Sequence, residues 1–223
     1  MKSLIRSMMI VSLGLCVFLG AGYVGSAQTA QVGVDSSRTW LGYMNVYDLG
    51  NNYLWGNAWG TADLPAVFSG STLTLSPNVN VYNAVDPYWV NPDGSGAKLM
   101  DANFYVEDAS LSGNNVVFSG NVLANTLAAG YTAQAFIKEF TAGYGWVNGT
   151  WADLIGGQPF SLSQATTAGD IIQYGFEVKG PDANPATVAL LGYASLEAIP
   201  EPTSLALLGL GLVSGLGLLR RRQ

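Results

Sequence analysis

Apolar and polar side chains alternate one for one along several segments in the middle of the chain. The alternation is clearest over residues 100–107 and 172–179, and it recurs over 72–75 and 160–163. A period of two puts one face of a β-strand on a core and the other face in water. Between the two ends of the chain, no long window repeats its apolar residues at the 3.6-residue spacing of a helix. The body of the chain is therefore predicted to be all-β.

Short clusters of turn-forming residues separate these segments. They lie at 50–52, 69–71, 92–94, 113–115, 156–157 and 180–182. Short strands with turns at such spacing are typical of an antiparallel β-sandwich or jelly roll, and the pattern leaves the strand order open. We also expect Asn114 and Asn115 to close a hairpin, because asparagine tolerates positive φ.

The first 27 residues have the features of a secretory signal peptide. Lys2 and Arg6 precede an apolar run over 8–19, and small residues lead up to Ala27. This order is what signal peptidase requires, so we expect cleavage after Ala27, with a second candidate site three residues further on. The alternative is an N-terminal anchor that is not cleaved.

The tail over residues 199–223 combines three parts. It opens with the tripeptide Pro200, Glu201 and Pro202. It closes with the basic residues Arg220, Arg221 and Arg222. The uncharged run between them, 203–219, is near the lower limit of about 17 residues for a transmembrane helix. The arginines should stay in the cytoplasm, which places the body of the chain outside.

These three parts, in this order, resemble the PEP-CTERM sorting signal of Gram-negative bacteria. Proteins with such a tail are similar to substrates of exosortase, a membrane transpeptidase of the cysteine class. The resemblance implies a helix that anchors the precursor transiently in the inner membrane, a cut near 200–202, and delivery to the cell surface or an extracellular polysaccharide matrix. The two prolines would keep the motif extended and accessible. The alternative is an ordinary C-terminal anchor.

The chain is thus expected to have three parts. They are a signal peptide at 1–27, a β-sandwich ectodomain at 28–198 and a sorting tail at 199–223, so that an N-terminal signal helix and a C-terminal transmembrane helix flank an all-β domain. Several stretches of the body are similar to ectodomains that accompany this tail in other bacteria, a group without an established activity. They are residues 40–46, 59–64, 135–138 and 173–177.

Composition excludes several kinds of site. The single cysteine, Cys16, lies in the predicted signal peptide, and the chain has no histidine. Disulfides, zinc sites of the usual ligands and Ser-His-Asp catalysis are therefore not expected in the ectodomain. Residues 28–199 carry four cations and fourteen anions. Such acidity argues against nucleic acid as a partner, is compatible with calcium or neutral glycans, and also keeps an exported domain soluble.

Aromatic residues are the strongest candidates for a binding site. Flat rings near carboxylates and amides are what sugar sites use, because pyranose faces stack on rings while their edges take hydrogen bonds. The glycan candidates are Trp55, Trp59, Trp89, Tyr144, Trp146 and Trp151. The alternative is that these rings fill the core. For Trp40 and Tyr43 we expect core positions.

Acidic residues give a second set of candidates. The loop over 91–96 has some features of a calcium loop but lacks the acidic series and closing glutamate of an EF-hand. The calcium candidates are Asp93, Asp101, Glu107 and Asp108. A glycoside hydrolase would need two carboxylates at a set separation, and the sequence does not pair any. We therefore expect no enzyme, and no cofactor apart from calcium.

The function expected from the sequence is a structural or adhesive role at the cell surface or in an extracellular matrix. The expected partners are signal peptidase and exosortase during export, and extracellular polysaccharide afterwards. A carbohydrate-binding module is the first alternative. An ice-binding protein is the second, because the same tail accompanies such proteins, although only Thr72 and Thr74 supply the Thr-x-Thr pattern that an ice face needs.

Overall fold

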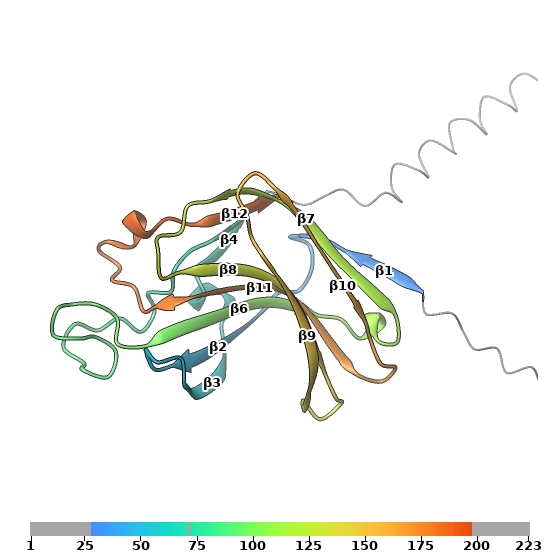
Figure 1. Cartoon of the computed structure of the whole chain (residues 1–223), viewed down its shortest axis with the longest axis horizontal. Helices are drawn as coiled ribbons and strands as arrows, with labels where there is room; N and C mark the ends of the chain where they lie inside the picture. Colours follow the sequence, from blue (N-terminus) through green and yellow to red (C-terminus); the bar gives the residue numbers. More distant parts are fainter. Residues whose placement is uncertain (1–27, 71, 198–223) are drawn as a thin grey trace, which may run out of the picture.

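The computed structural model describes residues 28–70 and 72–197, which form two β-sheets packed face to face (Figure 1). The all-β prediction is confirmed. The predicted signal helix and transmembrane helix lie outside these residues. Within the described part of the chain, the helices are too short to cross a membrane.

The first sheet contains six strands. They are β1 (Thr29–Val32), β4 (Ala66–Ser69), β5 (Thr72–Leu75), β7 (Asn115–Asn125), β10 (Pro159–Ala165) and β12 (Ala194–Glu197). Their order is β1-β7-β12-β5-β4, with β10 on the other side of β7. The predicted fully antiparallel arrangement is wrong at one place, because β1 runs parallel to β7. β7 is long enough to pair with β1 over its first four residues and with β12 over its last five.

The second sheet also contains six strands and is antiparallel throughout. They are β2 (Leu41–Tyr47), β3 (Tyr53–Trp59), β6 (Leu99–Glu107), β8 (Thr132–Phe140), β9 (Trp146–Asp153) and β11 (Ile171–Pro181). Their order is β3-β2-β6-β11-β8-β9. The alternating segments of the sequence become strands here and in the first sheet, with the apolar positions turned inward.

Aromatic side chains from both sheets meet in the core. Phe118 of β7 lies 5.1 Å from the rings of Phe160 and Tyr174 and 5.3 Å from that of Phe176, measured between ring centroids. Trp40 stacks on Phe104 at 4.5 Å, which agrees with its predicted core position. Burying each such ring contributes about 1.5–3 kcal/mol, so this cluster helps to hold the two sheets together.

The hairpin predicted around Asn114 and Asn115 is wrong. β6 belongs to the second sheet and β7 to the first, so the chain crosses from one sheet to the other here. The crossing contains a 3-10 helix, η2 (Ala109–Leu111), and its positive φ of 75° falls on Gly113. Two further 3-10 helices are η1 (Thr61–Asp63) and η3 (Val188–Leu191).

Candidate glycan-binding groove

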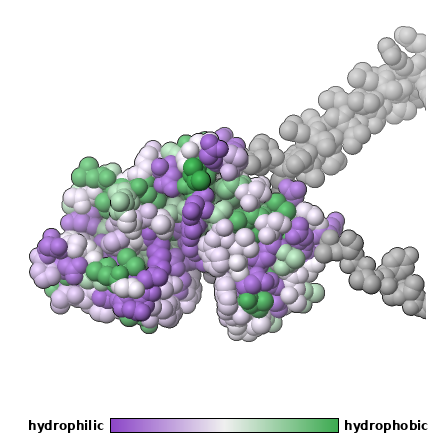
Figure 2. Space-filling view, viewed as in Figure 1, coloured by the Kyte–Doolittle hydropathy of each residue, from purple (hydrophilic) through white to green (hydrophobic). Residues whose placement is uncertain are grey.

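The outer face of the second sheet is hollowed into a groove with a volume of about 720 Å³. In Figure 2 it opens on the lower side of the molecule, between the part that holds β2 and β3 and the lobe that ends in the turn between β8 and β9. The groove is lined by the polar and aromatic positions of the alternating strands. The same period of two that builds the core therefore builds the groove on the opposite face.

The floor of the groove is a network of polar side chains from four strands. Lys138 of β8 donates to Asn103 Oδ1 at 2.5 Å and to Glu177 Oε2 at 2.8 Å. The carboxylate of Asp101 accepts from Asn45 Nδ2 at 3.2 Å and from Asn103 Nδ2 at 3.1 Å. These bonds hold the side chains in fixed positions, as a preorganised recognition surface requires.

The surroundings of the floor raise the pKa of two groups. Burial raises the pKa of the Asp101 carboxyl to about 6, repulsion from Glu177 adds to the rise, and Lys138 opposes it. Burial likewise raises the pKa of the Tyr47 hydroxyl to about 12, with smaller effects from Asp101 and Glu177. Tyr47 is therefore a neutral phenol at physiological pH.

Two indoles form one wall of the groove. Trp146 and Trp151 of β9 lie 6.0 Å apart between ring centroids, with 29° between their planes. Gly149 stands between them in the sequence, and a methyl group there would come within 2.6 Å of Trp151 and 2.8 Å of Trp146. The missing side chain lets both rings lie over the strand. They stay 56% and 38% exposed, so a large part of each side chain is accessible to a ligand.

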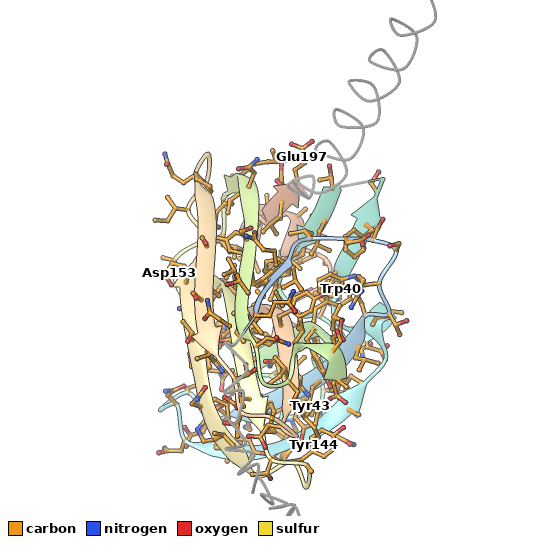
Figure 3. The ribbon with its side chains drawn as sticks, turned by 90° about the vertical axis from the view of Figure 1, so that its right-hand side faces the viewer. Trp40, Tyr43, Tyr144, Asp153 and Glu197 are labelled. Carbon is orange, nitrogen blue, oxygen red and sulfur yellow. The ribbon has the colours of Figure 1, made fainter. Side chains whose placement is uncertain are left out.

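Tyrosines border the groove beside the indoles and opposite them. Tyr144, in the turn before β9, donates its hydroxyl hydrogen to Glu107 at 3.1 Å. Tyr43 and Tyr47 of β2 also line the groove, and Lys179 lies 3.7 Å above the centre of the Tyr47 ring. Figure 3 shows Tyr43 and Tyr144 at the same end of the molecule. The expectation that Tyr43 is a core residue is wrong, because odd-numbered residues of β2 point away from the core.

The structure separates the six glycan candidates into two groups. Tyr144, Trp146 and Trp151 line the groove. The other three, Trp55, Trp59 and Trp89, pack against the hydrophobic core and do not line it. Trp55 and Trp59 pair across the strands with Val46 and Gly42, so they share the inward face of the sheet. All three are half-buried, so less of each ring is open to a ligand than in the groove.

The calcium candidates are not brought together. Asp93 accepts from Ser95 within its own turn, and Asp108 caps η2 and pairs with Arg38. Asp101 is on the groove floor, and Glu107 accepts from Gln173 and Tyr144 at the end of β6. In the described residues, no three acidic side chains are grouped closely enough to hold a metal ion.

Sequence reasoning missed the floor of the groove. Asn45, Asn103, Lys138 and Glu177 come from β2, β6, β8 and β11, and each is an ordinary polar position of an alternating strand. The one available signal was that polar positions 101 and 103 lie in the strand with the most regular alternation. That signal does not distinguish a hollow from a flat surface.

The other predicted site residues lie beyond the described part of the chain. These are Ala27 and the residues of the tail, Pro200, Glu201, Pro202, Arg220, Arg221 and Arg222.

Comparison with known proteins bears on the tail. No curated protein matches the chain. The family described as PEP-CTERM protein-sorting motif matches residues 198–222. A motif of this kind marks a protein for export and for processing by exosortase, by way of a membrane-anchored precursor. The chain thus carries a PEP-CTERM sorting motif, which confirms the recognition made from the tripeptide and the terminal arginines.

Proposed function

We propose that this protein binds extracellular polysaccharide through the groove and serves as a structural or adhesive component of the cell surface or matrix. The observation that carries the proposal is the pair of exposed indoles, Trp146 and Trp151, beside a hydrogen-bonded polar floor. Pyranose rings present apolar C–H faces and hydroxyl edges, so they need both kinds of surface at once.

The dimensions and position of the groove support the same function. Its volume of about 720 Å³ is within the usual range for ligand sites and holds a few sugar units. The floor offers carboxylate and amide oxygens as acceptors, and amide and ammonium groups as donors. A protein delivered to the outside by its sorting motif would meet polysaccharide there.

We propose that the role is binding without catalysis. Glu177 is ion-paired with Lys138 at 2.8 Å, and both carboxylate oxygens of Asp101 accept hydrogen bonds from asparagines. A glycosidase needs one carboxylic acid to donate a proton and a second carboxylate to attack or activate water. In this proposal both carboxylates hold the floor in place, and neither reacts with the sugar.

The test is affinity electrophoresis of the exported protein in native gels that contain soluble polysaccharides. Trp151→Ala and Tyr144→Ala should each weaken binding about tenfold, which is about 1.4 kcal/mol. Tyr193→Ala is the matched control, because Tyr193 is 44% exposed and precedes β12 in the other sheet. Equal retardation of the three variants and the parent protein would refute the assignment of the groove.

A further inference from the structure

We infer that the groove selects neutral glycans and excludes anionic ones, an inference that rests on the proposed glycan-binding function. The charged side chains that line the groove are Asp101, Lys138, Glu177 and Lys179, so their formal charges cancel. What decides selectivity is whether any of these charges is available to a ligand.

Both lysines of the groove are already engaged. The ammonium of Lys138 donates to Asn103 and Glu177 and lies 3.9 Å from the centre of the Phe136 ring. Lys179 donates to Asn51 Oδ1 at 2.6 Å and covers the ring of Tyr47. A sugar carboxylate or sulfate would therefore have to share either ammonium with the partners that already hold it. The side chains of the Lys138–Glu177 pair are 12% and 13% exposed. Breaking the pair would therefore leave an unpaired charge in a poorly solvated place.

The carboxylates of the floor also disfavour anionic glycans. Asp101 is 6% exposed, and Glu177 is its diagonal neighbour on the adjacent strand, opposite Asn103. Ionised carboxylates only accept hydrogen bonds, which suits sugar hydroxyls and repels sugar carboxylates. Residues 28–199 add a field of the same sign, with ten more anions than cations. Because like charges repel each other at an interface, this field weakens the binding of anionic glycans.

The first arm of the test compares probes of both kinds on the exported protein. The neutral probes are hydroxyethyl cellulose, galactomannan and xyloglucan, and the anionic probes are alginate and chondroitin sulfate. At low ionic strength, we expect at least one neutral probe to bind about tenfold or more tightly than either anionic probe. Trp151→Ala should reduce that difference, because it weakens the binding of the neutral probe about tenfold.

The outcomes separate the two claims. Binding of anionic probes as tight as that of neutral ones, and about tenfold weaker in Trp151→Ala, would overturn the selectivity and leave the glycan-binding function standing. Binding of none of the five probes above background would overturn both.

The second arm tests whether removing one carboxylate from the groove shifts its selectivity toward anionic glycans. Glu177→Gln removes the partner of Lys138 and gives the groove a net positive charge, so the ratio of anionic to neutral binding should rise about tenfold. Glu197→Gln makes the same charge change on an exposed side chain at the end of β12, in the other sheet (Figure 3). A ratio that rises equally in both variants, or in neither, would overturn the role of the Lys138–Glu177 pair. The wild-type comparison stands even if Glu177→Gln fails to fold.

Discussion

At the scale of single residues, the buried carboxyl group of Asp182 is a feature that costs stability. The residue is 2% exposed, and in the described part of the chain neither of its side-chain oxygens has a hydrogen-bond partner. Burial raises the pKa of this carboxyl to about 7, from an ordinary value of 3.8. The chain tolerates it because a protonated carboxyl is far cheaper to bury than a carboxylate.

This carboxyl makes stability depend on pH in a defined direction. Between about pH 4 and pH 7 the folded state keeps a proton that the unfolded chain has lost, so its contribution to the free energy of unfolding falls as pH rises. Asp182→Asn should therefore stabilise the protein relative to the parent by about 1–3 kcal/mol at pH 8 and by much less at pH 4. Urea denaturation at both pH values measures the difference. The control is Asp153→Asn, which makes the same change at an exposed carboxylate. If Asp182→Asn changed the free energy of unfolding equally at both pH values, the prediction would be contradicted.

At the scale of elements, the groove depends on how closely β11 approaches β6. A methyl group on Gly175 would lie 2.2 Å from the carbonyl oxygen of Phe104 and 2.6 Å from the Cα atom of Tyr105. Both contacts are with backbone, which cannot turn aside as a flexible side chain can. The glycine thus keeps the two central strands paired beneath the polar floor.

Gly175→Ala should lower the free energy of unfolding by about 1–3 kcal/mol, because the two strands must separate to admit the methyl group. Gly143→Ala is the matched control, since nothing lies within 4 Å of a methyl group in that turn. Its effect should stay within about 0.5 kcal/mol. Thermal unfolding followed by near-ultraviolet circular dichroism compares the two variants. Equal melting temperatures would contradict the prediction, because they would show that the strands move apart at little cost.

At the scale of the whole molecule, the sorting motif directs the protein, and the groove with it, to the outside of the cell. Glu201 is the one charged residue of the tripeptide, so an enzyme that reads the motif has a side chain to recognise there. Glu201→Ala should leave the protein in the inner-membrane fraction, whereas the parent protein reaches the outside. Cell fractionation with mass spectrometry of the exported product measures both the location and the cut sites. Unchanged delivery of Glu201→Ala would contradict reading of the motif.

The sequence by itself determined the all-β class of the body and the character of the tail. Residues 100–107 and 172–179 became central strands of one sheet because a period of two can bury only one face of an extended chain. The tail was recognised because its tripeptide, apolar run and arginines are contiguous. Each of these signals is local, so no knowledge of distant contacts was needed.

Only the tertiary structure decided which face of the sheet is hollow and which aromatic rings border it. Trp55 and Trp151 look alike in sequence, yet one packs on the core and the other lines the groove. Asn45, Lys138 and Glu177 meet because β2, β6, β11 and β8 are successive in the sheet, an order that alternation does not encode. The physical reason is that periodicity fixes the side of a strand to which a residue points, whereas strand order and sheet curvature arise from packing over the entire core.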